Sequence, residues 1–325
     1  MLVYIIRRLA WMVVLLFAVS AITFVVFYVL PSGDPAKKRA GSRASTERVE
    51  AVRRQLGLDK PKVALPWKDS QVRRYYDDLL LHGDLGHSYS NDAAVWDSIK
   101  SRLPATLQLA LGAMVIWLLA AFPVGILSAL KRRSLLDRVT MGAALLAISA
   151  PVYWLGLVVL YLFDDTLGRF PLLPAYDAYV PPSQDPVQWF QTMLLPWFVL
   201  AASFAAVYAR LLRSNLSEAM GEDYIRTARA KGLRERRVVM HHGVRSAVTP
   251  VVTILGIDLG VLLGGAILTE KVFNIPGIGR LSVNAIARGD IPTIQGTVLF
   301  AAFFIILLNL VVDIAYSFLD PRVTY

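Results

Sequence analysis

Residues 105–129 read ATLQLALGAMVIWLLAAFPVGILSA and carry no charged side chain. A bilayer core about 30 Å thick is crossed by a helix of roughly 20 apolar residues, so this run is long enough to span a membrane. Similar apolar runs occur at residues 9–30, 139–163, 192–212, 248–268 and 292–318. We therefore predict an all-α membrane protein with six transmembrane helices.

The composition supports a membrane protein. Of the 325 residues, 56% are hydrophobic and 18% are charged, with a mean hydropathy of +0.52. Soluble domains average roughly 45–50% apolar and about 25% charged residues, so a disordered tail, a small secreted scaffold and an ordinary soluble enzyme are excluded. The net charge of +10 is weak evidence for a nucleic-acid partner, because basic residues also mark the cytoplasmic side of membrane proteins. No nucleic-acid partner is expected.

The basic residues predict which helix ends face the cytoplasm. With the N-terminus inside, the inner segments hold 16 Lys and Arg residues, whereas the two short outer loops hold four. This asymmetry favours cytoplasmic N- and C-termini. The first apolar run is longer than the 7–15 residues of a secretory signal core, so we expect it to remain as a span.

A long polar segment, residues 31–104, separates the first apolar run from the second. Its 74 residues exceed the length to which the positive-inside rule applies, so its charge is compatible with an extracytoplasmic location. The predicted parts are an N-terminal transmembrane helix at 1–30, an extracytoplasmic cap at 31–104, and a five-helix core at 105–325 with a cytoplasmic loop at 213–247.

Enzyme signatures are missing from the sequence. A Walker A loop requires G-x-x-x-x-G-K-[ST], because backbone amides and a lysine must wrap the phosphates, and no such string occurs. The patterns H-E-x-x-H and G-x-S-x-G are absent as well. His241 and His242 are neighbours that project about 100° apart on a helix, so they do not chelate one ion together. We expect no catalytic, cofactor-binding or metal site on this chain.

The cytoplasmic loop contains a candidate surface helix within residues 218–233. Glu222 and Asp223 fall in its first turn, where the helix dipole favours negative charge, and Gly232 falls where a helix stop is expected. One face carries Glu222, Arg226 and Arg229, and another carries Tyr224, Ile225 and Ala228. A helix this short is unstable alone and needs a partner. An apolar face suits a protein groove, and a basic loop resting on anionic lipid head groups is the alternative.

This stretch resembles the cytoplasmic EAA loop of permease subunits of ATP-binding-cassette (ABC) importers, in the peptide-type branch of oligopeptide, dipeptide and nickel permeases. The run typical of that branch appears as Tyr224-Ile225-Arg226-Thr227-Ala228-Arg229-Ala230-Lys231-Gly232-Leu233. The general loop has glutamate in place of Arg226 and a proline closer to the glycine than Pro250. Both departures are similar to the peptide branch.

Further motifs of that branch follow in order along nearly the whole chain. They are Pro31-Ser32-Gly33-Asp34-Pro35, Leu56-Gly57-Leu58-Asp59-Lys60-Pro61, Gly83-Asp84-Leu85-Gly86-His87-Ser88, Arg102-Leu103-Pro104-Ala105-Thr106-Leu107, Thr269-Glu270-Lys271-Val272-Phe273, Pro276-Gly277-Ile278-Gly279, Asp290-Ile291-Pro292 and Leu319-Asp320-Pro321-Arg322. The first is a one-residue expansion of the P-G-D-P pattern of the family. Their number and order make the resemblance specific.

The resemblance implies a type I importer permease of the bacterial plasma membrane that forms half of a translocation pathway for di- or oligopeptides. It implies a homologous second permease, two ATPase subunits that hold ATP and magnesium, an extracytoplasmic substrate-binding protein that touches the cap and the outer loops, and membrane lipid. The loop helix would dock into an ATPase and pass its closure to the spans. The residues implied in this coupling are Glu222, Arg226, Thr227, Ala228, Arg229 and Gly232. Ala228 would allow close approach, and Gly232 would let the chain turn back.

The fifth apolar run has two notable features. Gly256, Gly260 and Gly264 form a stripe at four-residue spacing, which permits close helix packing, and a flexible or pore-lining stripe is the alternative. Asp258 lies about halfway along the run. A carboxylate at that depth costs roughly 2.5–3.5 kcal/mol on insertion scales and should face water, a partner or substrate. Two readings stay open: it lines the path and meets the amino end of a peptide, or it is a buried pair or a neutral acid.

Other functions stay open beside peptide import. An ABC permease for nickel or another small solute is the nearest, because in this family selection lies largely with the binding protein. A secondary transporter without an ATPase would often show inverted repeats and interrupted helices, and no such symmetry is evident. A membrane-embedded enzyme or assembly factor would need a convergent catalytic set, which the sequence does not offer.

Overall fold

The computed structural model describes residues 2–29, 34–41, 44–55, 58–61, 70–166 and 168–319, and in these ranges it contains helices and no β-strand. The α-helices are α1 (Leu2–Phe24), α2 (Pro35–Ala40), α3 (Thr46–Gln55), α4 (Gln71–Leu81), α5 (Val95–Leu130), α6 (Leu135–Ser149), α7 (Val152–Phe163), α8 (Pro186–Ala219), α9 (Asp223–Ala230), α10 (Glu235–Arg237), α11 (Arg245–Leu263), α12 (Ile267–Val272), α13 (Ile278–Arg288) and α14 (Ile291–Leu319). Two π-helical segments, η1 (Val25–Val29) and η2 (Val238–Val244), continue α1 and precede α11. The predicted motif residues 31–33, 56–57 and 320–322 lie outside the described ranges.

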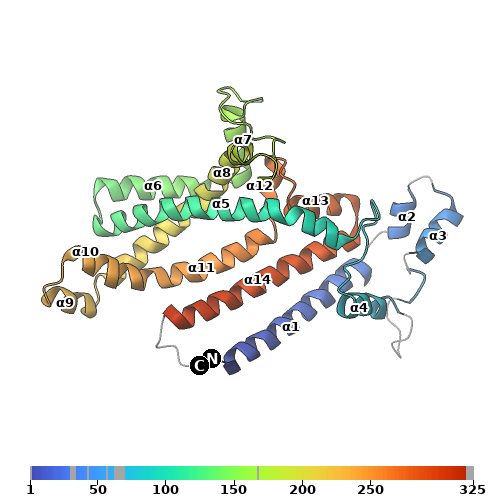
Figure 1. The fold of residues 1–325 in the computed structure, drawn as a ribbon, viewed down its shortest axis with the longest axis horizontal. Helices are drawn as coiled ribbons and strands as arrows, with labels where there is room; N and C mark the ends of the chain where they lie inside the picture. Colours follow the sequence, from blue (N-terminus) through green and yellow to red (C-terminus); the bar gives the residue numbers. More distant parts are fainter. Residues whose placement is uncertain are drawn as a thin grey trace.

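Five helical segments are long and apolar enough to cross a membrane. They are Ile6–Phe27, Val95–Leu130, Pro186–Ala219, Glu235–Val272 and Ile291–Val312. Each overlaps one of the predicted apolar runs, and α1, α5, α11 and α14 run along the long axis of the molecule (Figure 1). The all-helical membrane architecture is therefore confirmed.

The remaining predicted span, residues 139–163, is not one continuous helix. It consists of two helices, α6 and α7, which are bent by 99° relative to each other. Pro151 lacks an amide hydrogen and disfavours a helical conformation at the residue before it, and Ala150 accordingly has φ −82° and ψ 123°. Counted as one bent span, this pair brings the number of candidates to six.

The second span begins earlier than the predicted boundary at residue 105. Helix α5 starts at Val95 and continues through Pro104, so the last part of the predicted cap belongs to this helix. The reason is an amphipathic first section, in which Val95 and Ile99 are fully buried one turn apart and pack against Ile278 of α13 and Phe300 of α14. The apolar run alone did not reveal this section because charged residues alternate with the buried ones.

The core lies where α5 packs against α8. Trp117 is fully buried and stacks on Phe204 with ring centroids 4.7 Å apart, and Tyr208 lies beside it at 5.8 Å. The helices approach closely because Gly112 leaves room for the indole ring of Trp197. Helix α5 continues through Pro104 and Pro123, and α8 continues through Pro196. The α6–α7 segment, in contrast, bends by 99° at Pro151.

Large apolar side chains cover the outward faces of the helices. Val13, Leu119 and Leu146 are 67%, 70% and 75% exposed. Contiguous exposed apolar surface of this kind marks contact with a membrane or another protein. It is the surface expected of a multi-pass membrane protein.

Short helices lie at the two ends of the long axis, with α9 and α10 at one end and α2, α3 and α4 at the other (Figure 1). We call the end that carries α9 and α10 the α9 end, and the opposite end, with α12, α13 and the start of α5, the α13 end. The short helices α2, α3 and α4 lie at the α13 end. Both candidate regions described below are at these ends.

Candidate functional site

The short helix predicted within residues 218–233 is present as α9, Asp223–Ala230. Glu222 is its N-cap residue, and Asp223 opens the first turn, where the helix dipole favours an acid. The helix ends at Lys231, after which Gly232 has φ +75°. Glycine adopts this left-handed conformation at little cost, so the predicted stop at Gly232 is present.

The apolar face of α9 is buried against its own chain. Ile225 is fully buried and Ala228 is 6% exposed, and both pack against Val238 of η2. Met220 and Leu233 complete this cluster. The expectation of a free apolar docking face is therefore wrong for Ile225 and Ala228, which η2 covers, whereas Tyr224 of the same predicted face is exposed.

The remaining surface of α9 is charged and accessible. The Arg226 side chain is 75% exposed, and its Nη1 lies 3.3 Å from Oδ1 of Asp223, which is 94% exposed. Because they are exposed, both side chains are accessible to another protein. An exposed pair of this type contributes little to stability. Glu222, Tyr224 and Thr227 are exposed as well.

Arg229 fixes the direction in which the chain leaves α9. Its Nη2 and Nε donate to the two carboxylate oxygens of Glu235 in α10, at 2.7 and 3.1 Å. These hydrogen bonds raise the pKa of Arg229. The bidentate pair spans the turn at Gly232 and holds α9 against α10, so Arg229 has a structural partner within the chain.

The glycine stripe of the fifth run faces α14. A Cβ atom added at Gly256 would collide with Val312, one at Gly260 would lie 2.9 Å from Cα of Ile305, and one at Gly264 would lie 2.7 Å from Cβ of Ala301. The stripe thus lets α11 and α14 pack backbone to backbone, as small residues do in membrane helices.

Asp258 has a partner inside the protein. The buried hydroxyl of Tyr208 in α8 donates to Oδ2 of Asp258 at 2.7 Å, and Asp258 itself is half-buried in α11. The hydrogen bond crosses between the two helices. It offsets part of the cost of placing a carboxylate inside a membrane span.

Two buried acids organise the α13 end, and the sequence alone did not pair them with their partners. Glu270 of α12 is fully buried. It accepts hydrogen bonds from Oγ1 of Thr106 at 2.9 Å and from the amide of Arg280 at 2.8 Å. Gly277 passes so close to the Glu270 carboxylate that a side chain there would collide with it. Three motif segments, 102–107, 269–273 and 276–279, therefore meet at one carboxylate.

Asp290 is the second buried acid, at 4% exposed. It accepts hydrogen bonds from the Ser88 hydroxyl at 2.5 Å, the Tyr89 amide at 2.8 Å and the Thr293 hydroxyl at 2.9 Å. Ser88 and Asp290 are 202 positions apart in the sequence. The two motifs that contain them form one joint between the segment before α5 and the start of α14.

The histidine pair lies in η2, with the two rings edge to face and their centroids 5.2 Å apart. Across the described part of the chain, no group of three or more His, Asp or Glu side chains is arranged to hold a metal ion.

The chain is similar in sequence to a family of transport proteins. The family described as "Binding-protein-dependent transport system inner membrane component" matches residues 121–325. Its N-terminal companion, "Binding-prot-dependent transport system membrane comp, N-term", matches residues 1–110.

Two relatives are similar to this chain over nearly their whole length. A protein of Brucella abortus (strain 2308) named as a peptide transport system permease is 40% identical over 321 residues, covering 99% of this chain and 98% of the relative. The glutathione transport system permease protein of Escherichia coli (strain K12) is 40% identical over 325 residues, covering all of both chains.

Proposed function

The chain belongs to the family of binding-protein-dependent transport system inner membrane components, and on this premise we propose that α9 couples it to a separate ATPase. The protein is a permease of a peptide-type ABC importer and is built of membrane-spanning helices. The proposal concerns the ATPase that drives the permease and the solute that it carries.

The observation that carries the proposal is the two-sided environment of α9. One face is anchored through Ile225 and Ala228 to η2, while Arg226 and Asp223 point away from the chain. Because η2 continues into α11 within the candidate span Glu235–Val272, a displacement of α9 passes directly into a membrane helix. Glu222, Arg226 and Thr227 form the contact with the ATPase. Ala228, Arg229 and Gly232 hold α9 in place for that contact.

The α9 end faces the cytoplasm and the α13 end faces outward. The 16 basic residues of the inner segments support this orientation, which places both termini in the cytoplasm of a bacterium and the chain in its plasma membrane. The cap then lies outside as an insert after the first span, where a substrate-binding protein delivers its ligand. The type I importer fold is the one that membership of this family implies.

The permease forms half of a translocation pathway with a homologous second permease. Two ATPase subunits bind and hydrolyse ATP with magnesium, and this chain supplies no residue to that chemistry. Closure of the ATPases moves α9 and switches the pathway between its two faces, as in any two-state carrier. The cargo is a short peptide, in keeping with the names of the relatives.

Asp258 lines the pathway and meets the cationic amino end of a peptide. Its half-buried side chain, which accepts a hydrogen bond from Tyr208 of α8, supports this role. Asp258→Asn should lower peptide uptake at least tenfold without weakening ATPase association, and Tyr208→Phe, which keeps the carboxylate, is the matched control. Unchanged uptake in Asp258→Asn would remove Asp258 from the pathway.

Co-purification tests the coupling proposal. The tagged chain is purified in a mild detergent from its native host, as wild type, Arg226→Glu and the control Arg132→Glu, which changes an exposed cation between α5 and α6. A Walker A protein with ATPase activity should accompany the wild type and the control and be reduced at least tenfold with Arg226→Glu. A wild-type chain that purifies alone and still transports in vesicles would instead identify a secondary transporter.

A further inference from the structure

An ion pair with a buried carboxylate joins helices α6 and α8 near the α9 end. Asp137 lies in the first turn of α6, directly after the basic loop that contains Arg132 and Arg133, and it is 4% exposed. The hydroxyl of Ser134 caps α6 by accepting from the Asp137 amide at 3.2 Å. A carboxylate this deeply buried costs free energy unless it is paired and hydrogen-bonded.

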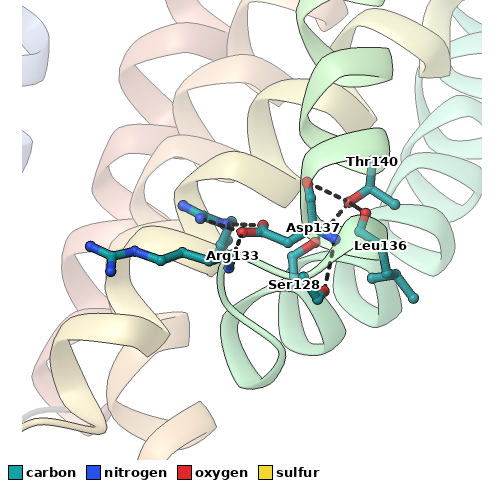
Figure 2. A network of polar contacts seen from close by, with 7 residues as sticks. Ser128, Arg133, Leu136, Asp137 and Thr140 are labelled. Atoms are coloured by element: carbon teal, nitrogen blue, oxygen red, sulfur yellow. Dashed lines mark hydrogen bonds and ion pairs between the residues drawn. The ribbon is translucent and has the colours of Figure 1, made fainter.

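Arg213 of α8 provides that pairing. Its Nε donates to Oδ1 of Asp137 at 2.6 Å, and its Nη2 donates to Oδ2 at 2.8 Å. The amide of Arg133 donates to Oδ2 at 2.9 Å (Figure 2). A guanidinium that holds a carboxylate through two parallel bonds resists rotation as well as separation.

Neighbouring contacts bring α5 into the same joint. The buried hydroxyl of Ser128 in α5 lies 2.8 Å from the hydroxyl of Thr140 in α6, which in turn donates to the carbonyl of Leu136 at 2.8 Å (Figure 2). About one turn earlier in α5, a Cβ atom added at Gly125 would lie 2.9 Å from the carbonyl oxygen of Ala209 in α8. Helices α5, α6 and α8 are therefore fixed to one another at this level.

The joint lies on the route that leads to α9. Arg213 is in the last two turns of α8, which ends at Ala219 just before α9 begins. Met220 packs into the Ile225 cluster of α9, and a Cβ atom added at Gly243 of η2 would lie 2.9 Å from its sulfur. A displacement of α9 therefore reaches the end of α8, and from there the ion pair is the direct polar link to α6.

We propose that Asp137 and Arg213 are positioning residues for transport, because their ion pair makes the start of α6 follow the end of α8 when α9 moves. This inference rests on the proposed coupling role of α9. Without the pair, an ATPase still binds α9 and moves the end of α8, and α5 still follows through its packing on α8, but the start of α6 is no longer tied to that movement. ATP is then hydrolysed with little transport.

The test compares ATP hydrolysis and uptake in one preparation of the complete transporter in proteoliposomes. The probe is a mixture of synthetic di- and tripeptides, whose uptake is quantified by mass spectrometry. Asp137→Asn should leave the ATPase rate within twofold of wild type and lower uptake per ATP at least tenfold. Arg213→Lys keeps the charge but not the paired bonds and should give a smaller loss, and the double variant Asp137→Asn/Arg213→Gln should be no worse than the more impaired single variant.

Arg138→Gln is the matched control, because it removes an exposed charge from the residue next to Asp137, and it should leave the ratio unchanged. An unchanged uptake per ATP in Asp137→Asn overturns the inference. If Asp137→Asn does not yield folded protein, uptake per ATP is measured for Arg213→Lys, and an unchanged value in that variant overturns the inference. Arg226→Glu in the same series separates the two proposals, because ATPase association that survives in that variant contradicts the coupling role of α9, whatever the ion pair does.

Discussion

The two ends of this permease use similar side chains for opposite purposes. At the α13 end, Glu270 and Asp290 are buried and each accepts hydrogen bonds from segments far apart in the sequence. At the α9 end, Arg226 and Asp223 remain on the surface and are joined only by one long contact. Both regions belong to the motifs by which the family is recognised. The two motif acids at the α13 end therefore hold distant segments together, whereas Arg226 and Asp223 at the α9 end stay accessible on the surface.

The largest expected effect follows from Glu270→Ala. The substitution leaves the Thr106 hydroxyl and the Arg280 amide without their buried acceptor, and each unsatisfied group costs about 1–3 kcal/mol. We expect a strongly lowered melting temperature in detergent, measured by fluorescence-detected size-exclusion chromatography after heating. Glu222→Ala, at the exposed N-cap of α9, is the control and should melt close to wild type. Equal melting temperatures for the two variants would remove the contrast between the ends.

A smaller effect is expected where the glycine stripe meets α14. Gly260→Ala places a methyl group 2.9 Å from Cα of Ile305, and overpacking of this kind typically costs about 1–3 kcal/mol. Gly142→Ala in α6 is the control, because a Cβ atom there has nothing within 4 Å. The melting temperature should fall for Gly260→Ala and stay the same or rise for Gly142→Ala. A stripe that serves flexibility and not packing would show no such difference.

The smallest effect on stability is expected for Arg226→Ala. Its side chain is 75% exposed, and a surface substitution of this kind changes the free energy of unfolding by no more than about 0.5 kcal/mol. Peptide uptake by the complete transporter should nevertheless fall at least tenfold. Normal melting together with normal uptake would show that Arg226 is not part of the coupling surface.

Local sequence patterns predicted the parts of the structure that depend on local physics. Apolar run length located the membrane helices, and the dipole-compatible acids and Gly232 located α9. The close packing permitted by the glycine stripe also follows from spacing alone, although its partner α14 does not.

The features that the sequence did not predict depend on contacts between distant segments. Ser88 with Asp290 and Arg213 with Asp137 are pairs separated by 202 and 76 positions, and no periodicity links their members. The burial of Ala228 was missed for the same reason, because the apolar face of a short helix does not reveal which protein covers it. The bend at Pro151 does not follow from the sequence alone, because Pro123 and Pro196 are also flanked by apolar residues and lie within continuous helices.

Site-directed cross-linking tests the coupling role of α9 most directly. The sequence contains no cysteine, so Thr227→Cys on the exposed surface of α9 can carry a single photoreactive maleimide, with Ser101→Cys at the start of α5 as the control. In the complete transporter, we predict a covalent adduct with the ATPase subunit from position 227 and none from position 101. No adduct from position 227, in a preparation that still couples ATP hydrolysis to uptake, would contradict the account.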